Sequence, residues 1–157
     1  MFDEETRAFL EGGCGLIVGT VAADGAPHAA RGWGMAVLDV GPPALVRLLL
    51  DSDDERTIAH VLDGRAIAVT ATDVMTLRSI QLKGRALSPE VLSPEDVARG
   101  TRYVEAFFAD VHAADKVPWE RFERFMPDGY VACTFEAHER YDQTPGPGAG
   151  ARVDTGG

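Results

Sequence analysis

The chain has 157 residues, of which 45% are hydrophobic and 25% are charged. This length suits one domain, and the composition is typical of a folded globular protein, so disordered, collagen-like and coiled-coil chains are excluded. The net charge of -10 argues against a nucleic-acid partner, because nucleic-acid binding depends on clustered cations. No apolar run approaches the roughly 20 residues that span a bilayer, and the acidic N-terminus is unlike a secretory signal, so we expect a cytoplasmic protein with no membrane partner.

The first part of the chain predicts a short helix, a β-hairpin and a third strand. Residues 3–11 begin with an aspartate that can cap a helix and carry acidic residues in the first turn. Residues 14–22 are rich in β-branched side chains, and an Asp24–Gly25 turn leads into a second extended stretch over residues 28–40. After a Gly-Pro-Pro break, residues 44–50 predict the third strand.

The middle of the chain predicts a second helix and two further strands. Ser52 with Glu55 three residues later forms a potential capping box, which predicts a helix over residues 53–63. Residues 65–72 alternate in polarity as a fourth strand. Residues 77–87 form a fifth strand with apolar side chains on one face and polar side chains on the other.

The last part predicts a long helix, a helical turn and a sixth strand. The long helix covers residues 94–114, and a helical turn follows Pro118. Residues 130–137 predict the sixth strand. We therefore expect one domain over residues 1–142, followed by a Gly- and Pro-rich extended arm or disordered tail over residues 143–157.

Six short strands with inserted helices predict a mainly β protein, a six-stranded antiparallel β-barrel with helices packed outside. The standard glycine-rich nucleotide loops are missing from the sequence, so any phosphate must be held in another way. The histidines and cysteines lack metal-ligand spacing, so no metal site is predicted, and Cys14 and Cys133 are expected to be buried, reduced thiols. No nucleophile motif occurs, and the catalytic residues stay unknown.

Cations and hydroxyls recur near strand ends and at one helix start of this acidic chain. Arg56 and Thr57 fall in the first turn of the second helix, where an anion binds favourably. Two interpretations of Arg56 stay open: a bridge between a phosphate and the helix start, or ion pairs with neighbouring acids in solvent. Arg78 and Lys83 are likewise either ligands or parts of a solvated strand face. The candidate phosphate set is Arg31, Arg56, Thr57, Arg78, Ser79 and Lys83.

Three segments carry a family resemblance: GLIVGTVAADGAPHAARGWG, ERTIAHVLDGRAIAVTA and LRSIQLKGRAL. In this order and spacing they resemble the FMN-binding split barrels related to pyridoxamine 5'-phosphate oxidase, over about residues 9–135. The resemblance implies a homodimer with an FMN in each of two clefts between the subunits. Of the oxidase's C-terminal Trp, Arg, His and Arg signature the chain keeps only His138 and Arg140. The expected function is an FMN-dependent oxidoreductase that acts on an unidentified small organic molecule.

The resemblance also implies roles for single residues. Arg31 resembles the arginine that approaches the flavin and its phosphate. Arg56 takes the place of a phosphate-binding lysine, and Thr57 could donate its hydroxyl to the same phosphate. Arg78 and Ser79 match an arginine followed by a flavin-contacting glutamine.

Three further residues complete the expected cofactor site. Gln81 lies two residues after Ser79 on the same strand face and could supply the missing amide. Arg31 or Lys83 could stabilise the reduced flavin at its N1–C2=O edge. Trp33 either forms a wall beside the ring or belongs to the barrel core.

Two alternatives to the FMN enzyme stay open. The cleft could hold the deazaflavin F420, which some relatives of this barrel use as a diffusible cosubstrate. The chain could also be a non-catalytic protein that binds flavin, haem or another ligand. Since a bound flavin carries the electrons, few dedicated catalytic side chains are expected in either enzyme.

Overall fold

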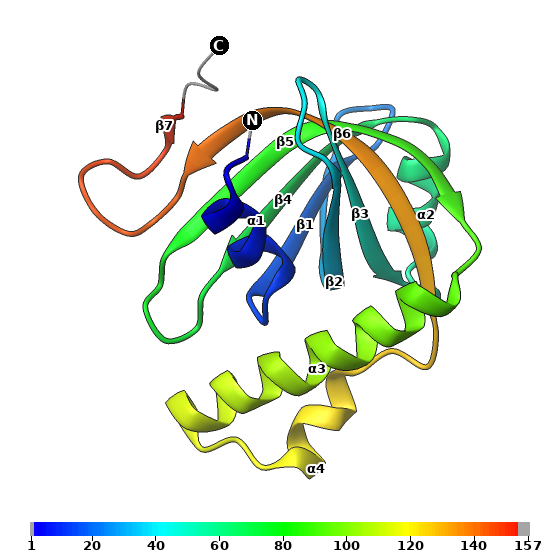
Figure 1. Cartoon of the computed structure of the whole chain (residues 1–157). Helices are drawn as coiled ribbons and strands as arrows, with labels where there is room; N and C mark the ends of the chain where they lie inside the picture. Colours follow the sequence, from blue (N-terminus) through cyan, green and yellow to red (C-terminus); the bar gives the residue numbers. More distant parts are fainter. Residues whose placement is uncertain (1, 154–157) are drawn as a thin grey trace.

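A computed structural model describes residues 2–153, which form a β-barrel with helices on its outside (Figure 1). The strands are β1 (Gly15–Val21), β2 (Pro27–Asp39), β3 (Ala44–Asp51), β4 (Ala66–Thr72), β5 (Ser79–Glu90), β6 (Tyr130–Asp142) and β7 (Ala151–Arg152). The helices are α1 (Glu4–Glu11), α2 (Glu55–Leu62), α3 (Pro94–Asp115) and α4 (Trp119–Phe122), followed by the 3-10 turn η1 (Glu123–Phe125). Within this part of the chain, no helix combines the length and apolar character needed to cross a bilayer.

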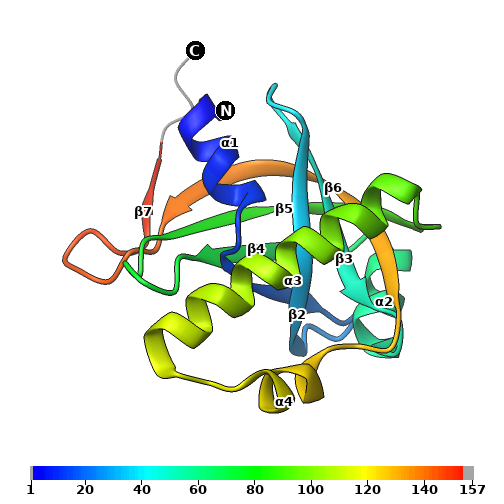
Figure 2. The ribbon, with the colours of Figure 1, turned by 60° about the horizontal axis from the view of Figure 1, so that its bottom comes forward.

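The sheet is antiparallel throughout, in the order β3-β2-β1-β4-β5-β6-β7. β6 pairs with both β5 and β3, and the second pairing closes six strands into a barrel (Figure 2). The sequence-based prediction of a six-stranded antiparallel barrel is therefore confirmed. β7 is a short addition to the edge of this barrel.

The core fills the barrel because alternate strand residues face inward. Cys133 lies in this core and Cys14 at its margin, both as free thiols, as the sequence predicted. Burial raises the pKa of each thiol to about 12, so both stay protonated near neutral pH. The largest fully buried side chains include Leu16, Val18, Val46, Leu48, Leu50, Val69, Leu82 and Phe135.

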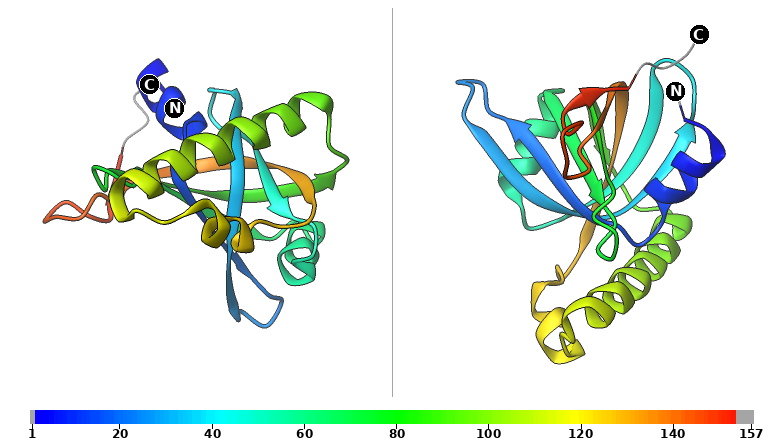
Figure 3. Two further views of the ribbon diagram at one scale, coloured as in Figure 1. Left: turned by 90° about the horizontal axis from the view of Figure 1, so that it is seen from below. Right: turned by 90° about the vertical axis from the view of Figure 1, so that its left-hand side faces the viewer.

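The helices cover different parts of the barrel. α1 and α2 lie on opposite sides, whereas α3 crosses one end and α4 turns back beside it (Figure 3). The predicted capping box of Ser52 with Glu55 is wrong. The N-cap of α2 is Asp54, whose carboxylate accepts from the backbone N–H of Thr57, whereas the Ser52 N–H donates to the Gly129 carbonyl.

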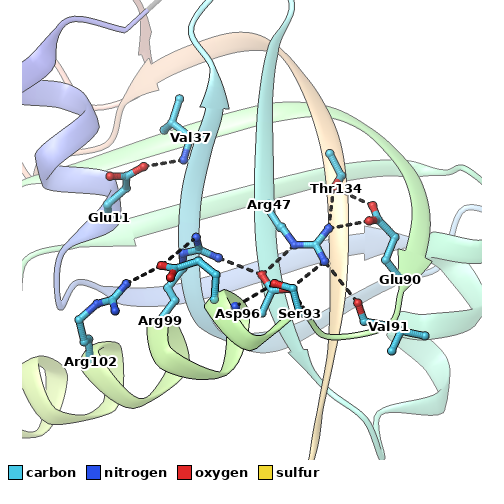
Figure 4. A network of polar contacts seen from close by, with 11 residues as sticks. Glu11, Val37, Arg47, Glu90, Val91, Ser93, Asp96, Arg99, Arg102 and Thr134 are labelled. Carbon is cyan, nitrogen blue, oxygen red and sulfur yellow. Dashed lines mark hydrogen bonds and ion pairs between the residues drawn. The ribbon is translucent and has the colours of Figure 1, made fainter.

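A network of ion pairs fixes α3 to the barrel (Figure 4). Arg47 of β3 donates to both carboxylate oxygens of Asp96, at 2.8 Å each, and to Glu90 at 2.7 Å. Asp96 also accepts from Arg99 at 2.9 Å and completes the capping box of α3 with Ser93. The hydrogen bonds from Arg47 hold the pKa of Asp96 well below its usual range, although burial opposes them.

The residues after β6 turn back on the barrel. β7 pairs with the end of β6, and the Val153 N–H donates to the Arg140 carbonyl. The sequence predicted an extended arm or disordered tail over residues 143–157. Residues 143–153 instead form a loop that returns to the sheet, and the remainder of that prediction lies outside the described residues.

Candidate functional site

A cross-strand row that runs around the outside of the barrel brings chemistry-bearing side chains from five strands into register. The strand pairings place Arg31, Ile17, Thr70, Gln81 and Tyr141 in a single row from β2 to β6. Their inward neighbours fill the core, so these side chains point outward. Neighbouring strands lie about 4.8 Å apart, so the path from Arg31 to Gln81 around the curved barrel covers three spacings, or about 14 Å. We call this surface the outer face.

The next positions along the same strands form a groove of about 660 Å³. Its floor carries small residues, Gly19 of β1 with Ala66 and Ala68 of β4. A Cβ atom added to Gly19 would meet only Ala68, at 3.8 to 3.9 Å, so open space lies above the floor. We call this hollow the outer groove; its lining is Gly19, Thr20, Val21, Pro27, Ala66, Ile67, Ala68, Lys83, Gly84, Arg85, His138 and Glu139.

Three cations on the outer face have no carboxylate partner. Arg31, Lys83 and Arg85 form no ion pair with any residue in 2–153. The Arg31 guanidinium lies 5.9 Å from the ring centroid of Phe107, and the Lys83 Nζ lies 4.3 Å from that of Tyr141. In a chain with net charge -10, such cations suit an anionic ligand.

Polar side chains continue from these cations to the C-terminal loop. Gln81 donates from Nε2 to Thr70 at 2.9 Å and accepts at Oε1 from Gln143 at 3.2 Å. The Tyr141 hydroxyl donates to Glu139, which raises the pKa of the tyrosine and lowers that of the carboxyl. The outer face thus combines cations, amides and a phenol around a floor of small residues.

The start of α2 does not present Thr57 to a ligand. Thr57 is 1% exposed, and its hydroxyl donates to the Asp54 carboxylate at 2.6 Å. His28 Nε2 lies 3.2 Å from the same carboxylate. Burial alone would raise the pKa of Asp54, but the hydrogen bonds from Thr57 and His28 outweigh it and lower the pKa. An internal carboxylate thus takes the donors of Thr57, and its phosphate contact stays a prediction.

Arg56 stays available where Thr57 does not. Its side chain is exposed, and it makes no ion pair with the described residues, its acidic neighbours included. Of its two predicted interpretations, the solvent ion pair is not observed. The phosphate contact of Arg56 stays a prediction.

Three more predicted residues lie away from the outer groove. Arg78 pairs with Glu5 at 2.9 Å and stacks on the Phe9 ring at 4.7 Å. Ser79 is 5% exposed, and its hydroxyl donates to the Leu77 carbonyl, so its flavin contact stays a prediction without support from this geometry. Trp33 is 3% exposed and belongs to the core, which agrees with the second of its two predicted interpretations. Of the predicted set, Lys83 lines the outer groove, Arg31 and Gln81 lie in the neighbouring row, and Thr57, Ser79 and Trp33 are buried.

Sequence reasoning missed part of this site. Gly19, Ala68 and Arg85 carry no motif of their own, and only the pairing of β1 with β4 and of β4 with β5 brings them together. Arg85 continues the alternation of Gln81 and Lys83 on β5, and that signal could have been used. In residues 2–153 no cluster of three or more His, Cys, Asp or Glu side chains could hold a metal ion.

Comparison with known proteins identifies the fold. The sequence matches no family model and no curated protein. One structural neighbour is HupZ of Group A Streptococcus, which is 17% identical, with 96% of this chain and 100% of that chain covered and a TM-score of 0.55. A second is an F420 reductase, which is 15% identical, with 88% of this chain and 98% of that chain covered and a TM-score of 0.51. A third is a candidate pyridoxamine 5'-phosphate oxidase of Lactobacillus delbrueckii, which is 21% identical, with 89% of this chain and 93% of that chain covered and a TM-score of 0.51. At these identities the likeness shows the fold. The chain has the split-barrel fold of pyridoxamine 5'-phosphate oxidase-like proteins, which confirms the predicted resemblance at this level.

Proposed function

We propose that this chain binds a flavin-type cofactor on its outer face and uses it as an oxidoreductase for a small organic molecule. The observation that carries the proposal is the outer groove of about 660 Å³, whose uncharged floor of Gly19, Ala66 and Ala68 lies beside Lys83. A groove with a floor of small residues suits a flat ring system. The split-barrel fold, which the chain shares with an F420 reductase and a candidate pyridoxamine phosphate oxidase, supports the same class of ligand.

The donor set of the outer face fits such a cofactor. Gln81 uses one amide N–H for Thr70 and keeps the second for a ring heteroatom. The Arg31 guanidinium carries five donors and would hold the polar edge of the ring, where a cation favours negative charge. A bound flavin would supply the hydride chemistry, while the protein binds and orients the ring and excludes water from it.

A second copy of the chain would complete this site. Ile17 lies in the row and is 48% exposed. Trp119 is 40% exposed, and Phe125 is 67% exposed. Large exposed apolar side chains close to a ligand surface favour a protein partner. We therefore propose a homodimer in which the partner covers the outer face, and its mass in solution is the direct test.

The cofactor proposal is tested by a visible absorption spectrum of the fresh protein and an FMN titration followed by flavin fluorescence. Flavin bands, or saturable binding of one FMN per subunit, are expected. Oxidation or reduction of a small molecule by the loaded protein would establish the enzyme, whereas stoichiometric binding with no turnover in a substrate screen would leave a flavin-binding protein.

F420 is the second candidate, favoured by the fold shared with an F420 reductase. Weak FMN binding together with F420-dependent reduction would select it. A colourless protein that binds neither FMN nor F420 would overturn the flavin proposal, and haem binding would then be measured.

A further inference from the structure

The chain contains two glutamines and no asparagine, and its two glutamine side chains meet on the outer face. Gln143 donates from Nε2 to Oε1 of Gln81 at 3.2 Å, although 62 positions separate the two residues. Gln81 donates in turn from Nε2 to the hydroxyl oxygen of Thr70, its partner in register on β4, at 2.9 Å. The Gln81 amide is therefore held from both sides by neutral groups.

The backbone of the C-terminal loop brings Gln143 to this position. Its N–H donates to the Ser79 carbonyl at 2.9 Å, and the Ser79 N–H donates to Thr144 Oγ1 at 3.1 Å. These two bonds continue the contact of β6 with β5 beyond Asp142, where β6 ends. At the far end of the loop, β7 pairs with Tyr141 and Asp142. The loop is thus tied to the sheet at both ends, and it carries one amide side chain to the outer face.

Both amides keep hydrogen-bonding groups that the described residues do not use. A primary amide has two N–H donors and an oxygen that accepts. Gln81 uses its oxygen for Gln143 and one N–H for Thr70, so its second N–H stays available. Gln143 uses one N–H, and its Oε1 accepts no hydrogen bond from residues 2–153. Neighbouring side chains therefore offer an uncharged donor and an uncharged acceptor. A lactam or imide edge, in which a C=O adjoins an N–H, carries the complementary pair.

The orientation of the Gln81 amide depends on Gln143. The oxygen and nitrogen of an amide are similar in size, so hydrogen bonds and not packing distinguish two orientations related by a half-turn. In the structure the Gln81 nitrogen faces Thr70 and its oxygen faces the Gln143 nitrogen. A half-turn of Gln81 alone would place two NH2 groups against each other and remove one hydrogen bond. Gln143 and Thr70 therefore fix which atom of Gln81 a ligand meets on either side.

We propose that Gln143 is a positioning residue, which with Thr70 holds the Gln81 amide in one orientation so that the two amides bind a lactam or imide edge of the ligand. The rings of flavins and deazaflavins have such an edge, so this choice of ligand rests on the proposed function. The positioning of Gln81 does not rest on it. The C-terminal loop is then part of the binding site, because its side chain orients Gln81 and accepts from the ligand.

The positioning is tested without a ligand, on the ¹⁵N-labelled full chain. Because the chain has no asparagine, its side-chain carboxamides give two pairs of proton signals, one pair from each glutamine. Gln143→Leu removes one pair and should shift the Gln81 pair and speed its exchange with water, since Oε1 of Gln81 loses its donor. Thr70→Val should also shift the Gln81 pair, because Nε2 loses its acceptor. Ala149→Ser is the control, because it changes an exposed position of the same loop and should leave both pairs in place.

A second variant changes the hydrogen bonding and hardly changes the shape. Gln143→Glu puts a carboxylate, which only accepts, in the place of the amide. Gln81 should then turn and donate from Nε2 to this carboxylate, while its Oε1 accepts from the Thr70 hydroxyl. A charge-assisted bond of this kind should move one Gln81 amide proton downfield of its wild-type position. If the Gln81 signals in Gln143→Leu and Gln143→Glu are those of the wild type, the positioning role is overturned.

The ligand edge is tested with FMN and 3-methyl-FMN, in which a methyl group replaces the ring N–H between the two carbonyls. The wild type and Ala149→Ser should bind FMN at least about tenfold more tightly than 3-methyl-FMN, whereas Gln143→Leu should bind the two within about threefold. Equal affinities in the wild type would overturn the choice of an imide edge. If neither compound binds while the Gln81 signals respond to Gln143→Leu, the proposed FMN site fails and the positioning of Gln81 by Gln143 is retained.

Discussion

The anchor of α3 and the outer face use the same kinds of charged side chain in opposite ways. Arg47 is 13% exposed and is held by Asp96, Glu90 and Thr134, so its charge is fully compensated. Arg31 and Arg85 are exposed and have no ion pair with the described residues. A compensated, buried cation holds elements together, whereas an uncompensated, accessible cation keeps its binding capacity for a ligand. The partners of an arginine, more than its presence, indicate its role.

The largest expected effect comes from breaking the anchor. Asp96→Ala removes the carboxylate that binds Arg47 and Arg99 and accepts from the Ser93 N–H in the capping box of α3, and it should lower the free energy of unfolding by about 3 kcal/mol or more. Urea denaturation measures this loss. Glu95→Ala is the control, because Glu95 is 63% exposed and its pairs with Arg99 and Arg102 should contribute about 1 kcal/mol or less. Equal losses in the two variants would contradict the anchor.

The same carboxylate should make stability depend on pH. The folded-state pKa of Asp96 is lowered, first by the hydrogen bonds from Arg47, relative to an unfolded value of about 3.9. Its contribution is therefore complete above that unfolded pKa and is lost as the pH falls through the folded one. Below about pH 4 the free energy of unfolding of the wild type should fall more steeply with decreasing pH than that of Asp96→Asn. Parallel slopes in denaturation series at several pH values would show that other carboxylates dominate.

Much of the barrel could be predicted because its signals are local. Two-residue alternation, the Asp24–Gly25 turn and the Ser93 cap of α3 each act within a few residues. β7 was missed because its pairing with β6 depends on long-range contacts of a segment whose Gly and Pro content suggests no strand. Local signals therefore predict elements well and their distant partners poorly.

The site was predicted only in part for a related reason. Alternation along β5 placed Gln81 and Lys83 on one face, as the structure has them. Thr57 and Ser79 were candidates by residue type, but their hydroxyls are bound internally, by Asp54 and by the Leu77 carbonyl. A sequence shows which groups can bind a ligand and does not show which of them the fold has already used.

A buried hydrogen-bonded pair should give an intermediate effect. Thr20 Oγ1 lies 2.8 Å from His60 Nδ1, and both side chains are buried between β1 and α2. Thr20→Val keeps the shape but leaves the imidazole nitrogen without its partner, so we expect a loss of about 1–3 kcal/mol in urea denaturation. Thr20→Ser keeps the hydroxyl and should lose less. A valine variant as stable as the serine variant would show that the hydrogen bond contributes nothing.

The smallest effect on stability is expected at Arg31, and there the comparison is sharpest. Arg31→Gln removes an exposed charge that makes no ion pair with the described residues and lies 5.9 Å from the ring centroid of Phe107, so the free energy of unfolding should change by about 0.5 kcal/mol or less. The same variant should weaken FMN about tenfold or more, because a charge-assisted contact to the ring is lost. Since a ligand that binds the folded state stabilises it by RT ln(1 + [L]/Kd), FMN should raise the thermal midpoint of the wild type more than that of the variant. If Arg31→Gln leaves the stability of the free protein unchanged and reduces the shift of the thermal midpoint by FMN, Arg31 serves ligand binding. A loss of stability in the absence of FMN would instead show that Arg31, like Arg47, stabilises the fold.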